Sequence, residues 1–135
     1  MTLGQTQRIF TRNIGCLILY AYEMGYELSF GEAERTKSQV LLNYYGYDVM
    51  FNKTDGIYLK KRNRTSKTLE SNHLERLAVD LNVFKDGVWI SSFEETKFLG
   101  EYWVSLHPKN RWGGDFNKNG VKDGFLDTPH YEMQR

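Results

Sequence analysis

Apolar and polar residues in the first part of the chain follow a helical period. Apolar side chains recur at spacings of three and four positions, which places them on one face of a helix. The residues of this face are Phe10, Ile14, Leu17, Ile18 and Ala21. Thr2 or Thr6 is suited to cap such a helix, and Gly25 is suited to end it. The pattern therefore predicts an amphipathic helix that packs on a core.

The apolar run 14–22 within this helix has a second interpretation, because Arg8 and Arg12 precede it as in an export signal. The run has nine residues, which is too short to span a bilayer. Glu23 follows it directly, and no small-x-small cleavage site closes it. We therefore expect a core helix, in a protein that is kept in the cytoplasm until something else releases it.

The remaining pattern predicts four strands and two further helices. The expected strands are 26–30, 77–83, 88–90 after the Asp86-Gly87 turn, and the segment around 130–133. The expected helices are 37–45 and 93–106, the second with Phe98, Leu99, Tyr102 and Leu106 facing the core. Residues 46–72 show only a weak pattern, and 113–124 read as a polar loop. This order predicts an α+β fold, a single domain 1–135 with helices packed on one face of a short, mostly antiparallel sheet.

Composition supports one globular domain and excludes several classes of protein. The chain has 135 residues, of which 40% are hydrophobic and 26% charged, so disordered, collagen-like and coiled-coil proteins are excluded. The net charge of +1 gives no global field for nucleic acid or an anionic membrane. Cys16 is the single cysteine, so no internal disulfide forms. We expect a monomer without a nucleic-acid partner and without stable membrane insertion.

Two polar segments contain residues that suit a metal site. His73 and Asp80 lie in the first segment, and His130 lies in the second. Three protein ligands of these types leave the fourth position of a catalytic zinc open for water. Asp80 and His130 would come from neighbouring strands, and a turn would bring His73 to them. Spacing alone fits equally well with a loop histidine and a capped carboxylate that bind no metal.

Two further carboxylates flank His130. Asp127 precedes Pro129, which keeps this segment out of the helical region, so Asp127 can stand beside a metal without binding it. There it could move a proton between water and a leaving amine, or it could be a turn residue. Glu132 shares a strand face with His130 and could orient the imidazole, or it could be a solvated charge.

The two segments together resemble a known family. Ser71-x-His73-x6-Asp80 and Asp127-x-x-His130-x-Glu132 resemble the SxHxxGxAxD and (E/D)xxHxE motifs of the zinc D-alanyl-D-alanine carboxypeptidase family. That family includes VanX- and VanY-type peptidases and phage endolysins that cut the L-alanyl-D-glutamate bond. Residues 31–39 resemble its upstream arginine segment, and 99–103 and 112–116 resemble its connecting helix and loop. The resemblance runs from about Phe30 to Glu132, with one departure, Arg76 in place of the family glycine.

The resemblance implies roles for individual residues. His73, Asp80 and His130 would bind zinc, Asp127 would be the general base and acid, and Arg35 would steady the scissile carbonyl oxygen. Ser71 would support the site by a hydrogen bond. By its sequence context alone, Arg35 is a surface charge at the start of a helix.

The implied function is hydrolysis of an amide bond in the peptide stems of peptidoglycan, with these residues on the sheet. Together with the expected cytoplasmic location, it favours a phage endolysin. A bacterial carboxypeptidase or dipeptidase, and a zinc-stabilised domain that binds wall peptide without cleaving it, are the alternatives.

The loop 115–123 resembles the first part of an EF-hand and suggests a second cofactor, calcium. Oxygen-bearing side chains fall at positions 1, 3, 5 and 9, namely Asp115, Asn117, Asn119 and Asp123, with Gly120 at position 6. The closing Glu at position 12 is missing, because Leu126 stands there. The alternative is a polar turn that binds nothing.

The tryptophans and a run of basic residues differ in the environments expected for them. Trp89 and Trp103 fall at core-like spacing, and Trp112, beside Gly113-Gly114, is the tryptophan suited to a substrate cleft. The basic run 60–67 is expected to be a solvated loop.

Overall fold

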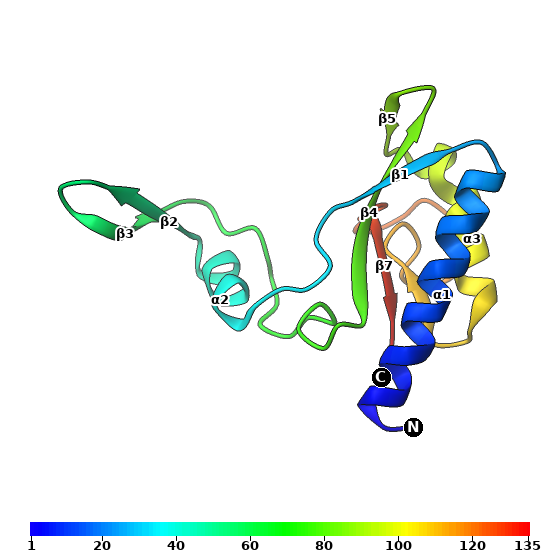
Figure 1. Ribbon diagram of the computed structural model, residues 1–135, viewed down its shortest axis with the longest axis horizontal. Helices are drawn as coiled ribbons and strands as arrows, with labels where there is room; N and C mark the ends of the chain where they lie inside the picture. Colours follow the sequence, from blue (N-terminus) through cyan, green and yellow to red (C-terminus); the bar gives the residue numbers. More distant parts are fainter.

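The computed structural model describes residues 1–135 and contains three helices and seven strands (Figure 1). In chain order these are α1 (Leu3–Glu23), β1 (Glu27–Phe30), α2 (Lys37–Tyr45), β2 (Tyr47–Asn52), β3 (Gly56–Lys61), β4 (Ala78–Lys85), β5 (Val88–Ile90), α3 (Phe93–Leu106), β6 (Asn110–Trp112) and β7 (His130–Met133). The expected helices and strands are all confirmed within a few residues. The pattern of the sequence predicts neither the β2–β3 hairpin nor β6.

The main sheet is antiparallel throughout, and β4 lies at its centre. Its strand order is β1-β4-β7-β6, and β5 pairs with the outer part of β4. In the register of β4 with β7, Val79 lies opposite Tyr131, and Asp80 lies opposite His130. Because side chains alternate across a sheet, these two pairs point to opposite faces.

The hydrophobic core fills the space between one face of this sheet and the helices α1 and α3 (Figure 1). Its buried members come from all of these elements: Phe10, Leu17, Ala21, Leu77, Val79, Leu81, Val83, Phe93, Leu99, Trp103, Trp112, Tyr131 and Met133. Of the four α3 residues expected to face the core, Leu99 is buried, and Phe98, Tyr102 and Leu106 pack on the core while partly exposed. The fold is therefore α+β with two helices on one face of the sheet, as predicted.

The N-terminal helix is a core element. Thr2 caps it, with a capping box in which the Thr2 side chain accepts a hydrogen bond from the backbone of Gln5 and the Gln5 side chain accepts one from the backbone of Thr2. Leu17 and Ala21, from the apolar run 14–22, are completely buried. None of the three helices combines the length and the apolar character that crossing a bilayer requires.

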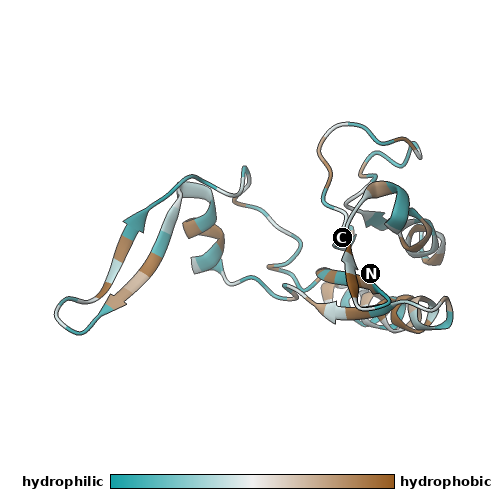
Figure 2. Cartoon of the chain, turned by 90° about the horizontal axis from the view of Figure 1, so that it is seen from above, coloured by the Kyte–Doolittle hydropathy of each residue, from teal (hydrophilic) through white to brown (hydrophobic).

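A separate part of the chain, α2 with the β2–β3 hairpin, projects away from the main sheet (Figures 1 and 2). The hairpin forms a two-stranded sheet of its own. The basic run expected as a loop begins inside this hairpin, because Lys60 and Lys61 belong to β3. Strand alternation is visible in a sequence when one face is buried. Neither β2 nor β3 has a buried residue, which explains why the pattern did not predict them.

Two of the tryptophans lie in environments opposite to those expected. Trp89, expected in the core, is more than half exposed on β5. Trp112, expected in a substrate cleft, is buried and stacks on Phe93, and its indole N–H donates to the carbonyl of Thr128 at 2.8 Å. A Cβ atom at Gly100 or Gly114 would come within 2.1 to 2.3 Å of its ring. Trp112 is therefore a core residue, and the glycines near it serve its packing.

Candidate metal centre

The structure brings His73, Asp80 and His130 together on the sheet face opposite the helices. One ligand atom of each lies within 4.8 Å of the others. Asp80 on β4 and His130 on β7 are direct cross-strand partners, so the sheet register fixes their separation. His73 comes from the turn that precedes β4. The expected geometry, two neighbouring strands and a turn, is confirmed.

A short network of hydrogen bonds holds the His73 turn. The Ser71 hydroxyl accepts the His73 backbone N–H at 3.2 Å, and the Leu77 N–H donates to the carbonyl of Asn72 at 2.9 Å. Arg76 stands where the motif that the sequence resembles has glycine, and its φ is +56°, the left-handed conformation that glycine adopts without strain. The turn therefore has a backbone conformation that suits glycine at this position.

In each histidine one ring nitrogen faces the cluster and the other faces away from it; we call them the inner and the outer nitrogen. Each outer nitrogen has a partner that can only accept a hydrogen bond. His73 Nδ1 lies 3.2 Å from the carbonyl oxygen of Ala33, and His130 Nε2 lies 2.7 Å from Glu132 Oε2. Both outer nitrogens must then carry a hydrogen and donate it. In the neutral rings the inner nitrogens, His73 Nε2 and His130 Nδ1, therefore carry the lone pairs.

The inner nitrogens face each other and the Asp80 carboxylate. They are 3.2 Å apart, and Asp80 Oδ1 lies 3.3 Å from His130 Nδ1 and 3.6 Å from His73 Nε2. Two lone pairs and a negative charge at these distances repel one another unless a cation lies among them. Two imidazole nitrogens and one carboxylate oxygen match the ligand set of a catalytic zinc site. The residues present therefore fit zinc.

The pKa values of the residues in this cluster agree with a site for a cation. Burial lowers the pKa of His130, but its hydrogen bonds to Asp80 and Glu132 outweigh burial and raise it to about 9. Burial raises the pKa of Asp80, but hydrogen bonds with His130 and His73 hold it well below its usual range. The site thus has a strong attraction for positive charge at the position where the three side chains meet.

Glu132 forms the contact with His130 that the expected orienting role requires, and it has a partner that the sequence did not indicate. The guanidinium of Arg111 on β6 pairs with its Oε1, with Nε at 2.7 Å. Burial raises the pKa of Glu132, but hydrogen bonds from His130 and Arg111 bring it to about 2. Arg111 lies directly across from Glu132 in the β6–β7 register. Since β6 itself was not predicted, no sequence signal could have placed Arg111 here.

Asp127 lies beside the cluster and is half-buried. Its backbone carbonyl accepts the His130 N–H at 3.0 Å, and its own N–H donates to the carbonyl of Gly113 at 2.7 Å. A Cβ at Gly113 would come within 2.1 Å of the Asp127 carbonyl oxygen, so only glycine allows this close approach. Burial raises the pKa of Asp127, and the charges of His130 and Arg35 oppose that rise.

Arg35 approaches the site from the segment between β1 and α2. Its side chain is largely buried and pairs with Glu32, and its backbone N–H donates to the carbonyl of His73 at 3.4 Å. Its charge acts on the pKa of Asp127. Its position next to the metal-site turn argues against the alternative of an uninvolved surface charge.

The loop expected to bind calcium is closed by its own hydrogen bonds. The Asp115 carboxylate accepts the backbone N–H groups of Asn119 at 3.1 Å and Gly120 at 2.8 Å. The Asp123 carboxylate accepts the side-chain amides of Asn117 at 3.2 Å and Asn119 at 2.7 Å. The side chains of Asn117, Asn119 and Asp123 therefore meet, whereas the Asp115 carboxylate binds the backbone of the turn.

Comparison with known proteins gives a relative of the same fold. No family model and no curated protein matches the sequence. Among solved structures, the chain is similar to the crystal structure of Serratia marcescens L-Ala D-Glu endopeptidase ChiX, with a TM-score of 0.61 and 19% sequence identity. The similarity covers 93% of this chain and 77% of that chain. At this identity the likeness shows a shared fold, in agreement with the predicted α+β architecture.

Proposed function

We propose that the protein is a zinc peptidase that hydrolyses an amide bond in the peptide stems of peptidoglycan. The observation that carries the proposal is the meeting of His73, Asp80 and His130 on one sheet face, with Asp127 and Arg35 beside them. A structural zinc site is closed by four protein ligands, whereas this cluster offers three. Two motifs in the family order supply four of these residues, and the upstream segment 31–39 supplies Arg35.

The roles of the residues follow from their positions. Zinc, when bound by the three ligands, would polarise the scissile carbonyl and make water more acidic. Asp127 accepts a proton from the attacking water and delivers it to the nitrogen of the departing amine as the C–N bond breaks. Its raised pKa suits both halves of this transfer. The Arg35 guanidinium, held in place by Glu32, stabilises the negative charge that develops on the carbonyl oxygen.

Two features favour an internal bond and a phage endolysin. The relative of the same fold is named an L-Ala D-Glu endopeptidase, so we propose that the same internal bond is cut here. The N-terminal apolar run belongs to the core helix α1, which suits a protein that waits in the cytoplasm of the infected cell. It then acts on the wall after release. A bacterial carboxypeptidase would use the same residues on a terminal D-Ala.

Digestion of purified peptidoglycan by the zinc-loaded protein tests the proposal, with the fragments identified by mass spectrometry. We expect stem peptides freed at the L-Ala–D-Glu bond, and no product after chelation. Release of D-Ala alone would indicate the carboxypeptidase instead. Binding of the wall without any product would indicate a non-catalytic domain and would contradict the proposal. Arg35→Lys is the informative variant, since an ammonium group does not reproduce the planar guanidinium, and we expect it to fold normally and lose turnover.

A further inference from the structure

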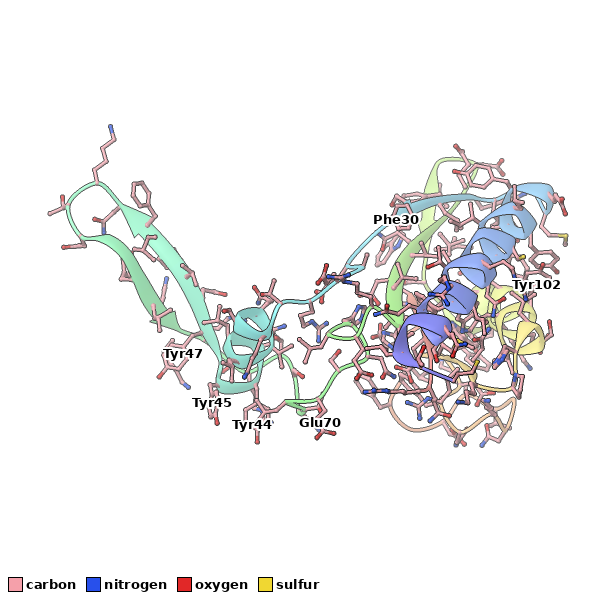
Figure 3. All side chains as sticks on the ribbon, turned by 60° about the horizontal axis from the view of Figure 1, so that its bottom comes forward. Phe30, Tyr44, Tyr45, Tyr47, Glu70 and Tyr102 are labelled. Carbon is pink, nitrogen blue, oxygen red and sulfur yellow. The ribbon has the colours of Figure 1, made fainter.

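The projecting part of the chain carries an apolar surface that no other part of the protein covers. We call residues 37–67 the arm; it contains α2, the β2–β3 hairpin and the basic run (Figures 1 and 3). In the hairpin register Val49 lies opposite Leu59, and Phe51 lies opposite Ile57. These four side chains share one face of the hairpin, which we call the tip face, and they are 55%, 57%, 70% and 75% exposed, in that order. Figure 2 shows the hydrophobic residues on both strands.

The tip face has the properties of an interaction surface. The side chains of the hairpin are absent from the hydrophobic core, and its two strands pair only with each other. An isolated two-stranded hairpin is marginally stable in water. A cluster of exposed apolar side chains on such an element marks an interaction surface.

Charge is distributed unevenly between the arm and the rest of the chain. Seven of the 18 Lys and Arg residues lie in the arm, against two of the 17 Asp and Glu residues. The arm therefore has a formal charge of +5, and the rest of the chain has −4, within the net +1. Lys53 in the turn forms no ion pair, and Lys60, on the hairpin face opposite the tip face, lies across from Asp48, which pairs with Arg62. The near-neutral total conceals a strongly basic arm.

We propose that the arm docks on the surface of an anionic lipid bilayer. Apolar side chains that enter the interface, surrounded by Lys and Arg, are the features of interfacial membrane binding. Phe51 and Ile57 flank the hairpin turn, so they reach a flat surface first. The negative charge on the rest of the chain is repelled by the same surface. The metal centre therefore stays on the water side.

The chemistry of the tip face favours lipid over the other anionic partners. The phosphates of a nucleic acid would pair with the lysines but would leave Val49, Phe51, Ile57 and Leu59 in water. Hydrated wall polymers present hydroxyl and carboxylate groups, and these four side chains have no polar atom to bind them. A lipid interface is the anionic surface that also takes apolar side chains. This inference is independent of the proposed peptidase function.

Co-sedimentation of the full chain with vesicles tests the proposal. We expect binding to vesicles of phosphatidylglycerol and phosphatidylcholine in equal parts, at least about tenfold stronger than to phosphatidylcholine alone, and weaker at high salt. Phe51→Ser with Ile57→Ser should reduce binding by at least about tenfold, because two large apolar side chains no longer enter the interface. Lys53→Glu with Lys60→Glu should weaken binding and reduce its salt dependence.

The matched control is Val88→Ser with Trp89→Ser, an apolar pair on the β4–β5 hairpin that is also more than half exposed. These residues lie outside the arm, so binding to the mixed vesicles should be unchanged. Equal losses in the control and in the tip-face variant would overturn the proposal, as would an absence of wild-type binding at low salt. A dimer in sedimentation velocity that the tip-face variant abolishes, or DNA binding that depends on Phe51 and Ile57, would overturn it as well.

Discussion

The orientation of His130 depends on a chain of three side chains from two strands. Arg111 holds Glu132, and Glu132 accepts the outer N–H of His130, so the inner nitrogen faces the other ligands. Partners of metal-binding histidines typically change metal affinity by 10- to 100-fold. We expect Arg111→Ala to weaken zinc binding by about 10-fold or more, and Arg111→Lys to weaken it less. Competition with a chelating dye measures the zinc Kd, and an unchanged Kd would show that Glu132 needs no partner.

Turnover should depend on the carboxylate of Asp127, whereas zinc binding should not. It lies beside the three ligands, and its pKa is raised by burial, so it can take up and release a proton. We expect Asp127→Asn to bind zinc with the wild-type Kd and to lose at least about 100-fold in peptidoglycan hydrolysis. If the variant cleaves at the wild-type rate, Asp127 is a turn residue.

Arg76 shows how a sequence departure can leave the backbone unchanged at a cost in stability. Its φ of +56° costs a non-glycine residue about 1 to 2 kcal/mol. Its ion pair with Glu34 is exposed and contributes little. We expect Arg76→Gly to raise the free energy of unfolding by about 0.5 to 1 kcal/mol, after the greater freedom of glycine in the unfolded chain is deducted.

Urea unfolding of the metal-free protein measures this change. Arg76→Ala is the control, because it removes the ion pair and keeps the strained backbone. We expect that variant to unfold with nearly the wild-type free energy. A glycine variant no more stable than the wild type would show that the left-handed conformation carries no penalty at this position.

At the scale of elements, the sequence predicted those whose side chains are divided between core and water. The helix α3 and the strand β4 each bury one set of side chains, and their periodicity is visible in the sequence. The β2–β3 hairpin buries no side chain, so no period marks it. The three-residue strand β6 is too short to show a period. The meeting of His73, Asp80 and His130 was predictable because they lie on or next to β4 and β7, and the resemblance to a zinc family, not the spacing, suggested that they bind metal.

The polar loop 115–123 is the element whose ion binding is open to test. Its Asp and Asn side chains already form hydrogen bonds within the loop, so calcium would replace these bonds rather than order a free loop. Two ligands are neutral amides and the closing Glu is absent, which suggests a Kd of about 10⁻⁴ M or weaker. The loop contains Phe116, whose ring centroid lies 5.7 Å from that of His130. Calcium binding to the loop would therefore affect the candidate metal centre.

We expect calcium to raise the activity of the zinc-loaded protein through this contact. The variant with Asp115→Ala and Asp123→Ala should not respond to calcium, while its basal activity stays measurable. Titration of calcium at saturating zinc, on both proteins, provides the measurement. No response in the wild type would show that the loop is a turn that binds no ion.

Across the whole molecule, the two faces of the main sheet have different surroundings. One face packs on α1 and α3, and the other carries His130, Glu132 and Asp80. This division follows from the alternation of side chains along β4 and β7. The sequence could predict both faces, because the apolar and polar residues of these strands alternate. It could not predict the direction in which the arm projects, because no buried contact fixes the arm to the sheet.

The pKa values of two residues on the second face, Glu132 and His130, predict how the stability of the metal-free protein depends on pH. The pKa of Glu132 is lowered to about 2, so its contribution is present above its unfolded value near 4.5 and is lost as the pH falls. The pKa of His130 is raised from 6.5 to about 9, so its contribution is present below pH 6.5 and is lost as the pH rises through 9. The metal-free protein should therefore be most stable between these limits, at about pH 5 to 6.5.

Zinc should reverse the pH dependence of the free energy of unfolding on the alkaline side. The metal binds the unprotonated inner nitrogen of His130, so its affinity increases as that proton is lost. We expect the free energy of unfolding to fall by on the order of 2 kcal/mol between pH 6.5 and 9 after chelation, and to rise over the same range with zinc present. Urea unfolding followed by the fluorescence of Trp103 and Trp112, both buried in the core, measures both curves. Glu132→Gln is the control, because it removes a carboxylate that raises the His130 pKa and should flatten the metal-free curve. Parallel curves with and without zinc would show that His130 is not a ligand.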